Sequence, residues 1–481
     1  MMGRQSPPQS KLFYTTVSLE KRVRKDHPLR KIARVVDFDF IYREVENCYG
    51  INGNVSVAPP VILKMMLLLI MYNVRSEREL MLTIPERLDW MWFLGYDLDD
   101  EVPDHSVLSK ARSRWGVEAF RSFFERIVCQ CVEAGLVDGT KLFIDASLID
   151  ADASNNSVVD THKYLDTSYR LFEERLDDVE DEKETPVNSR HISRTDPDAS
   201  VTRHGGGKPK LRYKTHRAVD PQCEVITATK LTPGSRDEGE LLAEMIEVHE
   251  LTTGTKVKTA VADSRYGKID NFLLCHDRGI KAHMPSLGDT QRGWGRQKGI
   301  FPKEVFCYDP LTDVFICPAG QLLKKRMYHK RRKTYEYKAS SETCACCELR
   351  QRCTRAKDGR SLKRHERQEA LDAILHVAKT TEAKRDIKTR QHLSERSFAR
   401  STRYGYKRAR WRRLWRVEIQ DFLVAAVQNI TILINHATDK LSKSNAQIGQ
   451  QRSLQELTGA LSCFRYLFML GGNFSMAFNT V

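Results

Sequence analysis

Two short apolar runs in this chain each lead into an aspartate. This arrangement limits the folds that the chain can adopt. LFIDAS (residues 142–147) contains Asp145, and KTAVADS (residues 258–264) contains Asp263. Both runs have β-branched residues and polar borders, which is typical of buried strands. We expect an α/β fold in which the two aspartates lie at the exposed ends of neighbouring strands of a β-α-β sheet. Ligand sites of such sheets lie at those strand ends.

One further carboxylate would complete a metal site with these aspartates. Glu395 lies in a later helical segment. Carboxylates from distant parts of a chain hold Mg²⁺ or Mn²⁺, because these hard cations prefer oxygen ligands. Two such ions can stabilise the attacking and leaving oxygens of a phosphoryl displacement. Taken singly, an aspartate after a strand is more often a turn residue or a helix N-cap.

The surroundings of Glu395 are strongly basic. Between Lys384 and Arg416 the chain has 13 lysines and arginines against two acids, Asp386 and Glu395. Aromatic residues are interleaved, and the acids that would pair with these bases along a helix are nearly absent. A solvated helix face is the usual explanation of a charge run, but this imbalance favours phosphate contacts. The predicted DNA contacts are Arg390, Arg396, Arg400, Arg403, Lys407 and Arg408.

The whole chain is basic as well, with a formal net charge of +15. This favours a polyanionic partner, nucleic acid before an anionic membrane, although a merely basic soluble protein has the same charge. The most apolar run, residues 61–72, contains Lys64 and is shorter than the ~20 residues that span a membrane. The N-terminus lacks the pattern of a signal peptide. We expect no membrane contact and a reducing cytosol.

In such a compartment the 12 cysteines are expected to be thiols or metal ligands rather than disulfides. Cys344, Cys347 and Cys353, with Cys317 upstream, offer four thiolates in a loop-like stretch, enough for a closed tetrahedral Zn²⁺ site. Cys346 would be a spare. Reduced thiols that pack in the interior are the alternative.

Changes in residue pattern divide the chain into segments. Apolar residues recur at helical spacing before residue 138, where Ser76 and Glu79 fit a capping box. YKTHRAVD and EVITATKL predict a strand hairpin that turns at Pro221, and DEGELLAEMIEVHEL predicts an amphipathic helix. The predicted segments are a basic N-terminal arm (1–35), a helical domain for DNA binding or dimerisation (36–138), the first part of an α/β core (139–286) with a polar insertion (151–210), a cysteine-rich insertion (287–365), the glutamate helix and closing helix of the core (366–437), and a C-terminal tail (438–481).

Local matches that occur in a fixed order carry a family resemblance. They are SERELMLTIPERLDWMWFLGYDLDDEVPDHSVLSKARSRWG, FIDASLIDADAS, SRTDPDAS with YKTHRAVD, LTPGSRDEGEL, VADSRYG, CPAG with CACCELRQRC, and SERSFARSTR with FLVAAVQNITIL. From about Asp37 to Ala437 the chain resembles bacterial insertion-sequence transposases of the DDE class, in the group with an InsH-like N-terminal domain.

This resemblance implies an RNase H-like mixed sheet flanked by helices, with an all-α N-terminal domain and a cysteine-rich insertion. It implies a divalent metal held by Asp145, Asp263 and Glu395 as the DDE triad. The expected activity is DNA transposition, in which element ends are cleaved and joined to target DNA. The expected partners are double-stranded DNA, as terminal inverted repeats and target, and a second copy of the chain in a homodimer. The expected location is the bacterial cytoplasm, at the nucleoid.

The glutamate departs from the family pattern. Related enzymes place tyrosine, arginine and lysine around it at positions occupied here by Lys388, Gln391 and Thr402. Glu418 is therefore a rival third ligand, although Ser-Glu-Arg-Ser-Phe-Ala around Glu395 matches the family segment. Two other functions stay open. One is a catalytically silent, transposase-derived DNA-binding protein, and the other is a structure-selective RNase H-like nuclease that shares the metal site.

Overall fold

The computed structural model describes residues 2–4, 18–50, 52, 54–161, 187–203, 205–287 and 299–438. Nearly all of the predicted tail, much of the N-terminal arm and the middle of the polar insertion lie outside the described residues. At the ends of that insertion a short ribbon joins β2 (Val158–Asp160) to β3 (His191–Ser193) beside α10 (Val187–Arg190).

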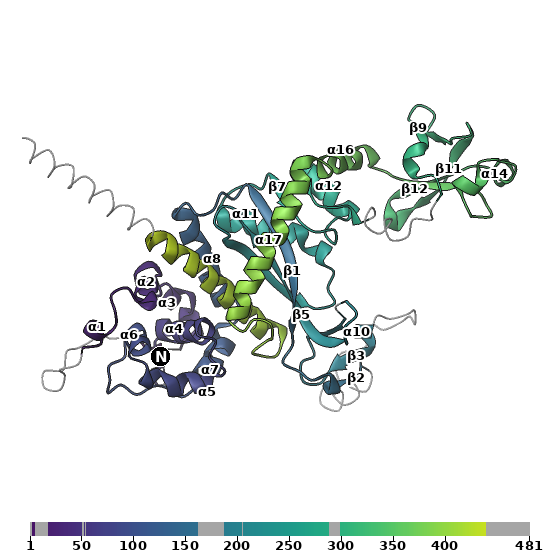
Figure 1. Cartoon of the computed structure of the whole chain (residues 1–481). Helices are drawn as coiled ribbons and strands as arrows, with labels where there is room; N and C mark the ends of the chain where they lie inside the picture. The colour runs from purple at the N-terminus through teal and green to yellow at the C-terminus, as the bar shows by residue number, and fades with distance from the viewer. Residues whose placement is uncertain are drawn as a thin grey trace, which may run out of the picture.

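A mixed sheet lies at the centre of the molecule (Figure 1). β1 (Lys141–Asp150), β5 (Lys210–Val219) and β6 (Ile226–Pro233) are antiparallel neighbours, and β4 (Ser200–Thr202) pairs with the first residues of β5. On the other side of β1 lie two parallel strands, β7 (Thr259–Val261) and β8 (Lys281–His283). The spatial order is therefore β6-β5-β1-β7-β8. This arrangement confirms the predicted α/β class.

The predicted hairpin of β5 and β6 is confirmed. Its strands are rich in threonine and other β-branched residues, which suit a pleated surface with both faces covered. Asp220 stabilises the turn, because its carboxylate accepts the amides of Gln222 at 2.9 Å and of Gly139 at 2.8 Å. Glu224 has a positive φ of 62°, so the chain reverses sharply after Pro221.

Helices cover both faces of the sheet. On one face α11 (Leu242–Thr253), α12 (Ile269–Asp277) and α16 (Gln368–Ala378) pack on residues that include Leu142 and Ile144. On the other face α17 (Thr381–Arg403) crosses β1 (Figure 1), and its Leu393 packs against Phe143 and Val261. Because Phe143 and Asp145 are two residues apart, α17 covers the face that bears Asp145.

The last described helix, Leu414–Thr438, is long and apolar enough to cross a membrane, but 83% of its apolar window is buried inside the protein. Asn429 bonds both backbone groups of Ile226 on β6, and Asp421 accepts hydroxyl hydrogens from Thr215 on β5 and Thr229 on β6. These contacts identify it as a core helix of the sheet domain.

The N-terminal block is helical, as predicted. Its Ser76 hydroxyl accepts the Glu79 amide at 3.1 Å, the first half of the predicted capping box. Phe124 packs on Phe422 at 5.8 Å between ring centroids, so the block shares a core with the last described helix. Its helices are α1 (Leu19–Arg22), α2 (Pro28–Val35), α3 (Ile41–Glu44), α4 (Pro59–Met71), α5 (Glu77–Thr83), α6 (Leu88–Leu94), α7 (Ser106–Trp115) and α8 (Glu118–Glu133).

Residues 299–365 form a second sheet, drawn to the side of the first in Figure 1. We expected a loop-like stretch here, and that expectation was wrong. Five antiparallel strands and two short helices build the segment around a small apolar core. They are β9 (Cys307–Asp309), β10 (Val314–Ile316), β11 (Leu322–His329), β12 (Thr334–Lys338), β13 (Ser361–His365), α14 (Ser341–Ala345) and α15 (Arg350–Cys353).

Candidate active site

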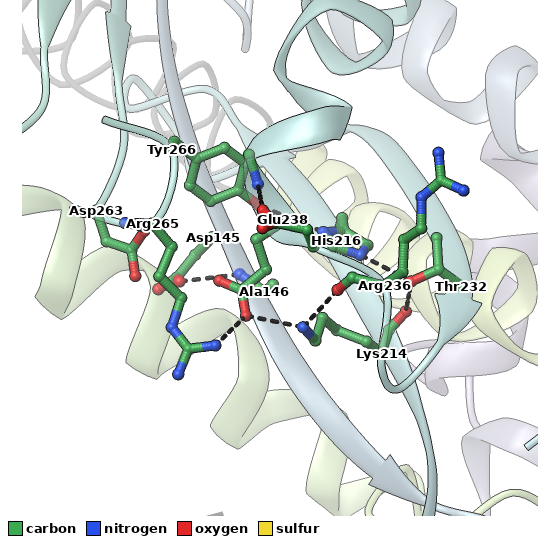
Figure 2. Close-up of polar contacts among 12 residues, drawn as sticks. Asp145, Ala146, Lys214, His216, Thr232, Arg236, Glu238, Asp263, Arg265 and Tyr266 are labelled. Atoms are coloured by element: carbon green, nitrogen blue, oxygen red, sulfur yellow. Dashed lines mark hydrogen bonds and ion pairs between the residues drawn. The ribbon is translucent and has the colours of Figure 1, made fainter. Parts of the chain in front are cut away.

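Asp145 and Asp263 lie at the same level of the sheet. The parallel register of β1 and β7 pairs Phe143 with Val261, and each aspartate follows its paired residue by two positions. We expected Asp145 at the end of its strand, and this was wrong. β1 continues to Asp150, paired with the long strand β5. Asp263 does follow the end of β7. Figure 2 shows both carboxylates on one side of β1.

The Asp145 carboxylate is largely buried, and its side chain is 22% exposed. Burial raises the pKa of Asp145 above its ordinary value, and the charge of Asp263 adds to the rise. The Arg390 guanidinium opposes this shift, with Nη1 at 2.6 Å from Asp145 Oδ2. The Ala146 amide donates to Oδ1 at 2.9 Å, and the Ser394 hydroxyl also bonds this carboxyl.

A third carboxylate, Glu238, lies close to the two aspartates (Figure 2). It begins the short 3-10 helix η4 (Glu238–Leu241) and is buried, with Lys214 Nζ and Arg265 Nη1 each at 3.1 Å. Tyr266 is fully buried beside it. Burial raises the pKa of Tyr266, and the charges of Glu238, Asp145 and Asp263 raise it further. The charges of all three carboxylates therefore act on one phenol.

Sequence reasoning missed Glu238, since DEGEL was interpreted only as the start of a helix. The signal that could have identified Glu238 is the pair of acids, Asp237 and Glu238, just before the helix α11 that leads to β7. His216 completes this environment as a buried, neutral side chain. Its Nε2 contacts Thr232 at 3.0 Å and its Nδ1 contacts Tyr266 at 3.3 Å. Burial lowers the pKa of His216 to about 3.

Glu395 lies on the exposed side of α17, one position after Ser394. Its carboxylate accepts a hydrogen bond from Gln391 at 3.2 Å. The positions of α17 that face Asp145 are Arg390 and Ser394.

The rival glutamate, Glu418, lies elsewhere. It is nearly buried on the last described helix, 3.6 Å from Lys230 Nζ on β6. Burial raises the pKa of Glu418, and the Lys230 and Arg121 charges oppose the rise. β6 is separated from β7 by two strands, so Glu418 lies on the far side of β1 from Asp263.

The six predicted DNA-binding bases have different surroundings. Arg390 pairs with Asp145, whereas Arg396 and Arg400 share Glu224 at 2.7 and 2.6 Å. Arg408 pairs with Asp152 at 2.9 Å and stays 65% exposed. Arg403 and Lys407 are exposed at the end of α17 and in the turn after it. These last two are best placed for a phosphate that arrives from solvent.

The donor set at β1 and β7 fits a hard divalent cation. Asp145 and Asp263 bring oxygen ligands of like charge together, and the raised pKa of Asp145 records their mutual repulsion together with burial. A bound cation would relieve that repulsion, as it does in paired carboxylate sites. Mg²⁺ and Mn²⁺ prefer such ligands.

A second group of possible ligands lies nearby, at His283, Glu382 and Asp386, whose ligand atoms lie within 4.8 Å of one another. Here Lys141 Nζ is 2.9 Å and His283 Nδ1 is 2.7 Å from the same Asp386 oxygen. Burial acts to raise the pKa of Asp386, but the Lys141 and His283 hydrogen bonds hold it below its ordinary value. Because Lys141 already supplies a positive charge, we assign this group to the packing of α17 against β1 and β8.

The four cysteines of the predicted Zn²⁺ site lie around one cavity, but they are not a group whose ligand atoms all lie within 4.8 Å of one another. Cys317, Cys344, Cys347 and Cys353 line one cavity of about 30 Å³ in the second sheet. Cys346 is exposed and does not line that cavity.

Two regions of the chain match models of known protein families. A model described as a transposase domain (DUF772) matches residues 17–114, which hold α1 to α6 and all of α7 but its last residue. A model described as a transposase DDE domain matches residues 316–434, from the end of β10 into the last described helix. The second match includes Glu395 but neither aspartate. No curated protein and no solved structure matches the chain.

Proposed function

The chain belongs to the insertion-sequence transposases of the DDE class, and on this premise we propose that it nicks DNA at the ends of its element and joins the freed strand to target DNA. The observation that carries the proposal is the register of β1 and β7, which brings Asp145 and Asp263 to one level of the sheet. An RNase H-like core is part of the proposal. Its support is the strand order β6-β5-β1-β7-β8, with three antiparallel strands followed by two parallel ones.

In this proposal Asp145, Asp263 and Glu395 hold the divalent metal. Bound Mg²⁺ would polarise the scissile phosphate and lower the pKa of an attacking water or 3′-hydroxyl. Glu395 is the residue of the three whose side chain extends to solvent, on a helix whose neighbouring turn faces Asp145. An exposed carboxylate can bind together with the arriving DNA, whereas the buried Asp145 is positioned by β1.

Arg390 would position Asp145 before DNA arrives. Its guanidinium favours the ionised form of the carboxyl, which a cation requires, against the effect of burial. The exposed bases that follow Glu395, Arg403 and Lys407, would contact the phosphate backbone without reading its sequence. We further propose that the helical N-terminal block recognises the terminal inverted repeats, that two copies of the chain hold two ends together, and that the reaction takes place in the bacterial cytoplasm.

A strand-transfer assay tests this function. The full chain is incubated with Mg²⁺, a labelled duplex that carries one element end, and a supercoiled target plasmid. We expect nicks at the end of the element and labelled products joined to the plasmid, and EDTA should abolish both. A substrate with a 3′-dideoxy terminus at a pre-cut end should bind normally but fail to join, because it lacks the attacking hydroxyl.

The assay also separates the other two functions. Nicking without any joined product would identify a structure-selective nuclease. Tight binding of the end duplex with neither nicking nor joining, in Mg²⁺ or Mn²⁺, would identify a catalytically silent DNA-binding protein.

A further inference from the structure

We propose that Cys317, Cys344, Cys347 and Cys353 bind one zinc ion that holds the second sheet together. This site is independent of the carboxylates of the first sheet and does not rest on the proposed DNA chemistry. It would be a structural centre with four thiolate ligands and no position left open for a substrate.

The four cysteines come from three separate parts of the segment and meet at one cavity. Cys317 directly follows β10, Cys344 lies in α14, Cys347 follows that helix, and Cys353 ends α15. The cavity measures about 30 Å³, more than the ~10–15 Å³ that is needed to hold one water molecule.

The backbone around Cys317 holds its sulfur in a fixed position. The Gln321 amide donates to Cys317 Sγ at 3.3 Å, and the same two residues are joined by a backbone bond at 2.9 Å. Gly320, with φ of +73°, makes this tight turn possible. Such contacts from outside a metal site orient its ligands.

A second turn closes over Cys344. Gly359 has φ of +88°, and a Cβ at this position would lie 2.9 Å from Cys344 Sγ. The turn therefore packs directly against the sulfur. All four cysteines are free thiols.

Two arginines also line the cavity. Arg360 donates to the carbonyls of Cys353 and Phe301, each at 3.1 Å, and Arg350 donates to the Lys357 carbonyl at 3.3 Å. Four thiolates around one divalent cation leave a net negative charge, since each thiolate carries one unit. Two guanidinium groups would compensate that charge, whereas beside four neutral thiols they would have no such role.

The size of the apolar core explains why this sheet would need a metal. Its buried apolar residues are Phe306, Phe315, Leu323, Tyr337, Ala339 and Leu362. A segment of this length with so small a core gains little stability from burial alone, and such segments commonly rely on a disulfide or a structural metal. The cysteines here are free thiols, the state from which they can bind zinc.

The test is metal analysis of the intact full-length chain. After dialysis against a weak chelator, we expect elemental mass spectrometry to find about one zinc ion per chain. Titration with a mercurial reagent should release that zinc to a chromogenic chelator as the thiols react. Growth in cobalt should give a chain with the thiolate-to-cobalt charge-transfer bands of a tetrahedral sulfur site.

Substitutions locate the site. Cys344→Ser and Cys353→Ser should each reduce the retained zinc at least tenfold, whereas Cys346→Ser, a neighbouring exposed cysteine outside the cavity, should retain it. Asp145→Asn should also retain it, because the carboxylates belong to a different site. Since a serine variant can lose zinc by failing to fold, the mercurial release from the wild-type chain decides the matter independently. A wild-type chain that contains no zinc after growth in zinc, or zinc that Cys346→Ser loses as readily as Cys344→Ser, would overturn the proposal.

Discussion

Arg390 Nη1 lies 2.6 Å from Asp145 Oδ2, so the first predicted metal ligand is already part of an ion pair. The two residues come from α17 and β1, far apart in the sequence. Burial and the neighbouring Asp263 both disfavour a charged Asp145, and Arg390 is the main opposing group. The pair therefore links the ionisation of Asp145 to the position of the glutamate helix.

A pH profile tests this link. Arg390→Gln removes the charge that lowers the pKa of Asp145, so that pKa should rise further. The acidic limb of the pH dependence of kcat/KM for nicking should then move to higher pH, because a larger share of the free enzyme carries a protonated Asp145. Arg385→Gln, an exposed arginine on the same helix, is the control and should leave the limb in place. An acidic limb that stays or moves to lower pH in Arg390→Gln would exclude this role.

Glu395 and Glu238 compete as the third carboxylate. If Glu395 holds the metal, Glu395→Gln should reduce the nicking rate about a hundredfold or more. Its side chain is exposed, so the free energy of unfolding should change by less than about 0.5 kcal/mol. The nicking rate and the urea unfolding are measured for Glu395→Gln and for Glu238→Gln. A Glu238→Gln variant that folds normally and loses nicking, while Glu395→Gln keeps it, would transfer the assignment to Glu238.

The sequence predicted the residues around Asp263 and the β5–β6 hairpin because local signals agree there. The β-branched residues and the turn at Pro221 both favour the hairpin of β5 and β6. The short apolar run before Asp263 favours the buried strand β7. It did not predict the length of β1, since ASLID after Asp145 has no strong strand pattern of its own. Those residues are extended because Lys210–Val219 offers a partner as far as Asp150.

Other parts depend on contacts between distant segments. The second sheet was not predicted because its strands are short and β11 is rich in lysine and arginine. The ion pairs of Arg396 and Arg400 with Glu224 join α17 to the β5–β6 turn, and no local pattern indicates them. For the same reason the run of bases did not reveal which of its members remain available to DNA.

The exposed bases should control the salt dependence of DNA binding. Arg403→Ala and Lys407→Ala should each weaken binding to all duplexes alike. Each should reduce the slope of log K against log salt by about 1, the change expected for one lost phosphate contact. Gel shifts or fluorescence anisotropy over a range of salt concentrations measure this slope. Lys256→Ala, an exposed lysine before β7, should leave the slope unchanged, and equal slopes in all four proteins would contradict the assignment.

His216 should make the fold sensitive to acid. Its pKa is about 3 in the folded chain against an ordinary 6.5, so between these values the unfolded chain binds the additional proton. Stability therefore falls as the pH decreases below 6.5, by about 1–2 kcal/mol at pH 5 from this residue. Urea unfolding of the wild type and of His216→Gln measures the effect. The variant should lose less stability over that interval, whereas His105→Gln, a more exposed histidine, should follow the wild type.

The measurement that tests the account most directly is Mg²⁺-dependent nicking of an element-end duplex by Asp145→Asn. The account predicts that nicking is abolished, while a gel shift of the same duplex and the thermal unfolding profile stay close to those of the wild type. Asp138→Asn, an exposed aspartate just before β1, should nick at the wild-type rate. Undiminished nicking by Asp145→Asn would contradict the central claim that Asp145 and Asp263 form the reaction centre.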